Sequence, residues 1–194
     1  SKIESGYFEL KLSNNNIISV VEDITLSVVE YAKSKGISLI FDTEVEEKIM
    51  ACDPDLIERI MLNLISNALK FTDSGGQVFI NIYDRQDKVI ISVKDTGIGI
   101  SQDKQKDIFE RFVQVHEKEA RRRQGSGIGL SLVKSLVKLH NGDIRVKSKL
   151  GEGSEFIVEL PVTLVEGNIR DEEQKRLSHE EYIEKIEIEF SDID

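Results

Sequence analysis

A polar stripe runs along a segment whose other residues are mostly apolar. Asn63, Asn67 and Lys70 are spaced at i, i+4 and i+7, so on a helix they share one face. Asparagine forms helices poorly because its amide competes for backbone hydrogen bonds. An amide oxygen is a neutral hard ligand for magnesium, and a lysine ammonium attracts phosphate oxygens. The stripe therefore fits a metal–triphosphate as well as it fits an ordinary solvated helix face.

A second motif, Asp95-Thr96-Gly97-Ile98-Gly99-Ile100, directly follows an apolar run. Its two spaced glycines permit a tight turn and a close approach of the backbone to a ligand. An ionised aspartate only accepts hydrogen bonds, so an exocyclic amine such as that of adenine is a natural partner for Asp95. Asp-Thr-Gly is also typical of aspartic proteases, but their chemistry needs two carboxylates that share a proton, and the chain carries one copy.

A third motif is the glycine-rich run Gly125-Ser126-Gly127-Ile128-Gly129-Leu130. It is not a Walker A loop, because no Gly-Lys-Ser/Thr follows it. It does not match the dinucleotide fingerprint either, because the polar stretch 121–124 stands where a strand is required. Its glycines lead into an expected helix, whose free N–H groups and dipole favour phosphate.

The elements that must position these motifs alternate between helical and extended patterns. We expect helices over residues 17–35, 54–71, 101–112 and 127–140, with Asn16 as a cap residue of the first and Pro54 in the first turn of the second. We expect strands over residues 8–12, 37–45, 49–52, 78–83, 89–93, 143–148 and 155–160, and a further short strand is possible over 186–190. The pattern predicts a two-layer α/β sandwich, with a mixed, mostly antiparallel sheet covered on one face by helices.

Taken in order, the motifs resemble those of the ATP-binding catalytic domain of sensor histidine kinases. This domain belongs to a superfamily shared with gyrase, a heat-shock chaperone and mismatch-repair ATPases, and has the Bergerat-type ATP-binding fold. Residues 63–72 resemble the N box, 95–99 the first glycine box, 109–112 the F box and 125–130 the second glycine box. The resemblance covers residues 17–162.

The resemblance implies ATP and Mg²⁺ as cofactors and assigns a role to each motif. Asn67 would bind the metal, while Lys70 and Asn63 would be the catalytic residues, with Lys70 on phosphate and Asn63 near the γ-phosphate. Asp95 would hold the adenine amino group. The remaining nucleotide-binding residues implied by the resemblance are Phe71, Gly97, Gly99, Ile100, Gly125, Gly127, Ile128, Gly129, Leu130 and Phe156. For Phe71, simple core packing is an equal alternative.

The resemblance also implies an ATP lid over residues 113–124. Many family members have an arginine two residues past the F box, and this chain has Gln114 there. Phosphate contact from the lid then either falls to the run 121–123, which could equally be a solvated loop, or is weaker than in those family members.

A histidine kinase needs an acceptor imidazole, which the family carries on a helical hairpin before the ATP domain. The chain has His116, His140 and His179, and only Ser178-His179-Glu180 superficially matches the acceptor signature. This match lacks the Arg and Pro that the signature requires and follows the ATP domain instead of preceding it. We therefore expect a fragment that lacks its own phosphate acceptor and works on an acceptor and dimerisation domain, with a response regulator downstream. The fragment would be monomeric and its parent protein a homodimer.

Composition limits the other function classes. The net charge is −10, from 26 basic and 36 acidic residues, which argues against nucleic acid as a partner. A single cysteine excludes an internal disulfide, so we expect a cytoplasmic protein, although its parent could be membrane-anchored. Much of the acidity lies after Pro161. We therefore expect the end of the acceptor region at residues 1–15, the ATP-binding domain at 16–162 and an acidic tail at 163–194.

Three alternatives share the fold. One is an anti-sigma-type serine kinase, which would give acid-stable phosphate. Another is a conformational ATPase such as a chaperone or gyrase head, which uses a glutamate base where this chain has Asn63, an amide that cannot take a proton. The last is a non-hydrolytic ATP-binding regulatory module.

Overall fold

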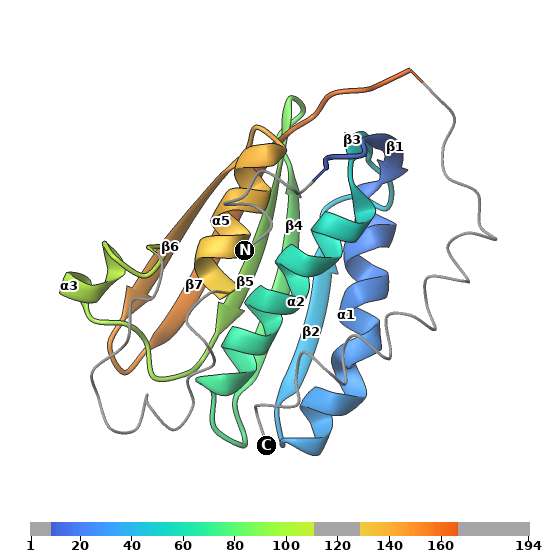
Figure 1. The fold of residues 1–194 in the computed structure, drawn as a ribbon. Helices are drawn as coiled ribbons and strands as arrows, with labels where there is room; N and C mark the ends of the chain where they lie inside the picture. Colours follow the sequence, from blue (N-terminus) through green and yellow to red (C-terminus); the bar gives the residue numbers. More distant parts are fainter. Residues whose placement is uncertain (1–8, 111–128, 167–194) are drawn as a thin grey trace.

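A five-stranded sheet forms one layer of the molecule (Figure 1). The computed structural model describes residues 9–110 and 129–166. The strand order is β2-β4-β5-β7-β6; β2 and β4 are parallel and every other neighbouring pair is antiparallel. The strands of this sheet are β2 (Ser38–Thr43), β4 (Gln77–Asp84), β5 (Lys88–Asp95), β6 (Asp143–Lys149) and β7 (Gly153–Pro161). The expected mixed, mostly antiparallel sheet is confirmed.

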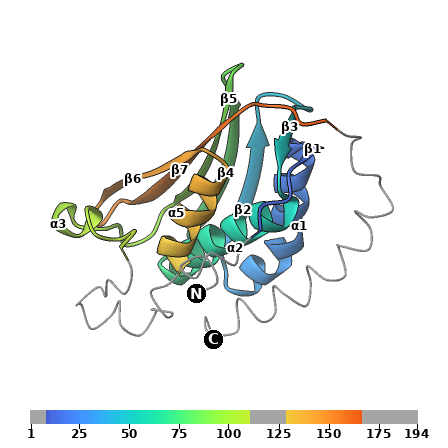
Figure 2. The ribbon, with the colours of Figure 1, turned by 45° about the horizontal axis from the view of Figure 1, so that its top comes forward.

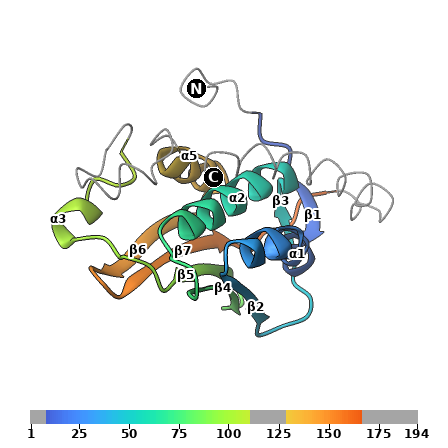
Figure 3. The same ribbon diagram turned by 90° about the horizontal axis from the view of Figure 1, so that it is seen from below.

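Three long helices lie on one face of the sheet (Figure 3). They are α1 (Ile17–Ser34), α2 (Pro54–Lys70) and α5 (Gly129–Leu139). The predicted N-cap at Asn16 is confirmed, because its side chain accepts from the Ile18 N–H. The helix α2 begins at Pro54 as expected, and the structure adds that the Asp53 carboxylate caps it by accepting from its first turn. The helix α1 is followed by Gly36, whose φ of 73° is a backbone conformation that glycine adopts at low cost.

The core fills the space between this helical layer and the sheet (Figure 2). Alternate residues of β4 and β5 are buried on the helical side, as the period of two in a strand requires. They meet the apolar face of α2, of which Ile57, Ile60, Met61, Leu64 and Ile65 are at most 2% exposed. The expected two-layer sandwich is thus confirmed, and α2 is the helix most deeply embedded in it.

A small second sheet differs from the expectation. The predicted strand over residues 8–12 is wrong for its described part, residues 9–12; the strand is β1 (Ser13–Asn16), which pairs antiparallel with β3 (Ile49–Cys52). Three successive asparagines do not indicate a strand by propensity. Tertiary hydrogen bonds decide it, because the Asn14 amide binds both backbone groups of Val165. The possible strand at 186–190 lies outside the described residues.

The helix predicted over residues 101–112 is much shorter in the structure. Only α3 (Gln102–Gln105) is helical, and residues 106–109 form turns. The Gln105 amide nitrogen donates to the carbonyl oxygens of Ile100 and Ser148, at 2.7 and 2.8 Å. These bonds hold α3 against β6 and outweigh the local helical preference.

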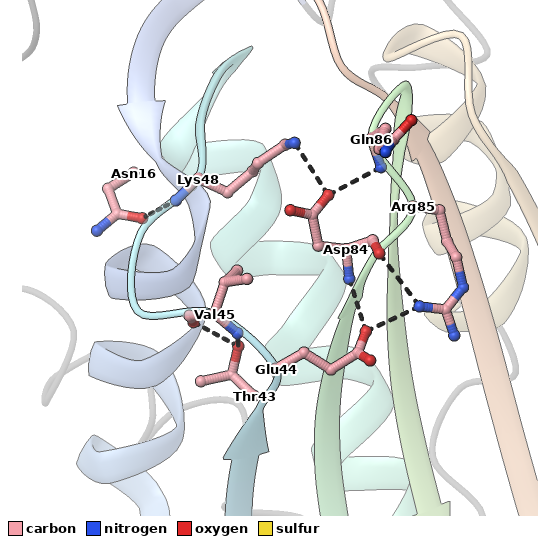
Figure 4. Close-up of polar contacts among 8 residues, drawn as sticks. All are labelled: Asn16, Thr43, Glu44, Val45, Lys48, Asp84, Arg85 and Gln86. Atoms are coloured by element: carbon pink, nitrogen blue, oxygen red, sulfur yellow. Dashed lines mark hydrogen bonds and ion pairs between the residues drawn. The ribbon is translucent and has the colours of Figure 1, made fainter.

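Ion pairs and hydrogen bonds join the β2–β3 loop to the β4–β5 hairpin (Figure 4). Lys48 Nζ lies 2.9 Å from Asp84 Oδ1, and the Glu44 carboxylate accepts from the Asp84 N–H and from Arg85. The hydrogen bond from Lys48 is the main cause that lowers the pKa of Asp84. Because Asp84 lies at the surface, we treat these bonds as fixing loop position rather than as a major source of stability.

The C-terminal described residues continue along β3. The Ala51 N–H donates to Thr163 O at 2.7 Å, so this segment lies beside the strand that leads into α2. Cys52 at the end of β3 is fully buried, and burial raises the pKa of its thiol to about 12. It is therefore a protonated core residue at neutral pH. None of the helices in the described ranges is long and apolar enough to span a membrane.

Candidate functional site

The polar stripe occupies the one face of α2 that the core does not cover. Asn63, Asn67 and Lys70 are each half-buried, whereas their helical neighbours from Leu64 to Leu69, apart from Asn67, are buried. The Asn63 amide nitrogen donates to Arg59 O at 2.8 Å, within the same helix, which leaves its oxygen directed away from that bond. The stripe therefore lies on the exposed edge of a rigidly packed helix.

The first glycine motif packs directly against the end of α2. Phe71, which follows the helix, accepts a hydrogen bond through its carbonyl oxygen from the Ile98 N–H at 3.0 Å. A Cβ on Gly97 would lie 2.1 Å from that same oxygen, so no larger residue fits there without movement. Gly99 has a φ of 73°, and a Cβ there would lie 2.1 Å from Lys149 O. The approach at Gly97 places the turn at the end of α2, and the approach at Gly99 places it against the end of β6.

Asp95 is the last residue of β5 and is only 3% exposed. Its Oδ1 accepts from the backbone N–H groups of Gly97, at 2.9 Å, and Ser154, at 3.2 Å. No group in the described ranges donates a hydrogen bond to its Oδ2. Burial raises the pKa of Asp95, and the two N–H groups partly oppose that shift. One oxygen fixes the side chain, and the other is able to accept from a ligand.

Sequence reasoning missed three residues that brace this turn. The hydroxyl of Ser148 accepts from the Ile100 N–H at 2.7 Å and lies 2.7 Å from the Ser154 hydroxyl. Gln105 holds Ile100 and Ser148 together from α3. Serines at a strand end and a glutamine in a short helix carry no sequence signal for this role. The pairing of β5 with β7 sets Ser154 opposite Asp95, and the pairing of β6 with β7 sets Ser148 opposite Ser154.

Phe156 lies beside the same turn, opposite Val93 in the sheet, and is 1% exposed. The Phe109 ring meets it edge-on, with ring centroids 6.1 Å apart and an interplanar angle of 88°. This is a favourable aromatic geometry. Phe109, the first residue of the predicted F box, is therefore packed onto the sheet beside β7, whereas residues 111–112 of that box lie outside the described residues.

The second glycine motif is described only from Gly129 onward. Gly129 begins α5, and a Cβ there would lie 3.1 Å from Asn63 Oδ1, so the start of α5 lies against the polar stripe. Leu130 is half-buried and packs against the core. The other residues predicted for the lid, the acceptor match and this motif lie outside the described residues: Gln114, His116, residues 121–123, Gly125, Gly127, Ile128 and His179.

The described parts of the three motifs therefore converge on one end of α2. The stripe offers amide oxygens and an ammonium group, the start of α5 offers helix N–H groups, and Asp95 offers a carboxylate oxygen. In the described ranges, no group of three His, Cys, Asp or Glu residues could hold a metal ion. The donor set fits a magnesium ion that takes one amide oxygen from the protein and its other ligands from phosphates and water.

An open cavity of about 610 Å³ adjoins the glycine turn. Its lining does not include Asp95 or the polar stripe. It is lined by Asp73, Ser74, Gly76, Thr96, Gly97, Ile98, Leu150 and Gly151. Of the residues predicted to bind nucleotide, this lining includes Gly97.

The family model and the similar proteins found by sequence agree with each other. The family model described as histidine kinase-, DNA gyrase B- and HSP90-like ATPase matches residues 52–164. The circadian input-output histidine kinase CikA of Synechococcus elongatus is 36% identical over 169 residues, which is 86% of this chain and 22% of that protein. The sensor histidine kinase RppB of Synechocystis is 37% identical over 143 residues, 74% of this chain and 32% of that protein. The chain thus spans less than a third of the length of these relatives.

The solved structures that resemble this chain include the catalytic domain of a histidine kinase. The catalytic domain of histidine kinase ThkA superposes with a TM-score of 0.70 at 25% identity, covering 79% of this chain and 99% of that domain. ShkA, solved with AMPPNP, superposes with a TM-score of 0.71 at 30% identity, covering 81% of this chain and 32% of ShkA. ThkA also has a structure in complex with a response regulator. The chain belongs to the family of histidine kinase-, DNA gyrase B- and HSP90-like ATPases, and its relatives are sensor histidine kinases.

Proposed function

We propose that this chain is the ATP-binding catalytic part of a two-component sensor histidine kinase, and that it transfers the γ-phosphoryl group of ATP to a histidine on a separate acceptor domain. The observation that carries the proposal is the convergence of Asp95, the polar stripe of α2 and the start of α5 on one surface. Residues 16–162 would form the catalytic domain, preceded by the end of the acceptor region and followed by the acidic tail.

Asp95 sets the orientation of the purine in this proposal. Its Oδ1 is held by two backbone N–H groups, so Oδ2 is directed without freedom to rotate. An acceptor in that position selects a base with an exocyclic amine and leaves an oxygen-bearing base without a donor. Phe156, Ile100 and Phe71 lie on the elements around this oxygen and would supply apolar contact to the base.

The polar stripe acts at the phosphate end. Lys70 would stabilise charge on the phosphate oxygens, and Asn63 would hold the γ-phosphoryl group in line with the attacking imidazole nitrogen. Asn67 would hold Mg²⁺, which neutralises charge on the phosphates when it is bound. The new bond joins the imidazole nitrogen to phosphorus, and the bond from phosphorus to the bridging oxygen breaks, so that ADP leaves with the electron pair.

Calorimetric titration with a non-hydrolysable ATP analogue tests the binding step. The wild-type chain should bind in the presence of Mg²⁺, and Asn67→Ala should make the remaining affinity insensitive to Mg²⁺. Lys94→Ala is the control, because Lys94 is an exposed residue of β5 outside the proposed site and its removal should leave both the affinity and its response to Mg²⁺ unchanged. Affinity that responds equally to Mg²⁺ in wild type and Asn67→Ala would remove Asn67 from the proposed metal site.

Transfer is tested with a histidine-containing acceptor domain supplied in trans with labelled ATP. Acid-labile, base-stable label on the acceptor supports a histidine kinase. Acid-stable label indicates a serine kinase instead, and binding with no label indicates a regulatory module. A response regulator is the partner we propose downstream, as in the ThkA complex.

A further inference from the structure

Asp53, at the N-terminal end of α2, makes hydrogen bonds to three segments of the chain. This is the end of α2 away from Lys70. Asp53 caps α2 through Oδ1, which accepts from the N–H groups of Asp55 and Leu56. Its Oδ2 accepts from the Lys11 N–H at 2.9 Å. Its own backbone N–H donates to Nε2 of His140 at 3.1 Å. We propose that Asp53 and His140 are positioning residues that set α2 against α5 and link both helices to the segment before β1.

His140 fixes the end of α5 to the start of α2. Because Nε2 accepts from Asp53, it carries a lone pair, and the proton of the neutral ring is on Nδ1. Nδ1 lies 2.9 Å from Leu136 O, one turn back in α5, and donates to it. Both ring nitrogens are thus used, and the side chain is only 8% exposed. The ring cannot rotate without breaking a buried hydrogen bond.

Both helices extend from the Asp53–His140 contact to the proposed phosphate end of the site. At a rise of about 1.5 Å per residue, Asp53 lies roughly 20 Å along α2 from Asn67. The helix is embedded in the core along this length, so it moves as a rod. The other end of α5 begins at Gly129, against Asn63. A change in the relative placement of the helices at the junction therefore changes the spacing of α5 and the polar stripe.

The third contact brings in the N-terminal segment. Oδ2 of Asp53 is buried with the rest of the side chain, which is 5% exposed, and loss of the Lys11 N–H would leave a charged oxygen without this donor. Lys11 lies two residues before β1, on the side of the chain where the proposed function places the acceptor region. The expected effect on binding rests on the proposed function: the position of the segment before β1 changes nucleotide affinity through Asp53.

Proline at position 11 tests this contact, because it removes the N–H and nothing else that Asp53 uses. Lys11→Ala is the matched control, since it loses the same side chain but keeps the N–H, and Glu9→Pro controls for proline in the same segment. We expect Lys11→Pro to weaken binding of the ATP analogue about three- to tenfold relative to Lys11→Ala. Equal affinities for these two variants would overturn the proposal.

His140 is tested by rescue. His140→Ala removes the acceptor for the Asp53 N–H, whereas His140→Gln places an amide oxygen near the position of Nε2. We expect His140→Gln to recover most of the affinity that His140→Ala loses. If His140→Gln binds as weakly as His140→Ala although its melting temperature matches that of the wild type, His140 is not a positioning residue.

Amide hydrogen exchange separates this inference from the proposed function, because it needs no nucleotide. Relative to Lys11→Ala, Lys11→Pro should speed exchange in the first turn of α2, at Asp55 and Leu56, and in the last turn of α5. Unchanged exchange rates in the first turn of α2 and in the last turn of α5 would overturn the proposal for Asp53 and His140, even if the chain binds ATP. Changed exchange in a chain that binds no nucleotide supports the junction and refutes the proposed function.

Discussion

At the scale of the residue, Asp95 combines a structural cost with a proposed binding role. Its carboxylate is buried, and burial raises its pKa above the ordinary value. Between the ordinary and the raised value, the folded chain holds more protons than the unfolded chain, so the free energy of unfolding falls as the pH rises through this range. The ionised form that accepts from an amine is thus the less stable one, which is typical of functional residues.

Asp95→Asn should separate stability from binding. The amide oxygen keeps both backbone hydrogen bonds, but the amide nitrogen presents a donor where the carboxylate accepts. We expect nucleotide affinity to fall at least about tenfold, and the free energy of unfolding at pH 7 to stay equal to or exceed that of the wild type. Titration and urea unfolding check both; wild-type affinity in Asp95→Asn would contradict the assignment of Asp95 to the base.

At the scale of the element, the glycine turn works because its backbone touches the end of α2. Gly97 and Phe71 are in contact through the backbone alone. The end of a flexible side chain could move aside to admit a substitution at Gly97, but a carbonyl oxygen at the end of a packed helix cannot. The position of the turn is therefore set by the helix, and the two motifs are one structural unit.

Gly97→Ala should damage this unit. Its Cβ would meet Phe71 O, so we expect a loss of about 1–3 kcal/mol in the free energy of unfolding, together with a clear loss of nucleotide affinity. Gly151→Ala is the control: its φ of 85° costs about 1–2 kcal/mol, but the added Cβ has open space around it. Urea unfolding and titration of both variants test this; a Gly97→Ala chain that binds like Gly151→Ala would show that the contact does not matter.

At the scale of the whole molecule, segments from the two ends of the described chain flank β3. The strand β1 pairs with one edge, and Thr163 bonds Ala51 of β3. Asn14 joins the two flanking segments, since its amide donates to Val165 O at 2.7 Å and accepts from Val165 N at 2.9 Å. Because β3 leads into α2, both ends of the described chain bear on the helix that carries the polar stripe.

Asn14→Ala should loosen this arrangement. Asn14 is 9% exposed, and its removal leaves two backbone groups of Val165 without their partners, so we expect a loss of about 1–3 kcal/mol in the free energy of unfolding. Leu164→Ala is the neighbouring control, because Leu164 is 67% exposed and should change stability by less than about 0.5 kcal/mol. Equal urea midpoints for the two variants would mean that the amide contributes nothing.

Local chemistry accounts for what could be predicted from the sequence. Helix starts and stops depend on a residue and its near neighbours, so they could be predicted from the sequence alone. Examples are the start of α1 after Asn16, the start of α2 after Asp53 and the end of α1 before Gly36. The periodicities of α2, β4 and β5 likewise follow from which residues must be buried. The resemblance to histidine kinases rests on motifs of the same local kind, and the family match confirms it.

Contacts between distant residues decided the rest. The strand at Ser13–Asn16 and the short α3 exist because Val165, Ile100 and Ser148 offer better hydrogen bonds than local propensity does. The bracing of Asp95 by Ser154 and the junction at Asp53 join residues 59 and 87 positions apart. No pattern along the chain encodes such a pair, because each partner is an ordinary residue until the packed sheet and helices bring the two together.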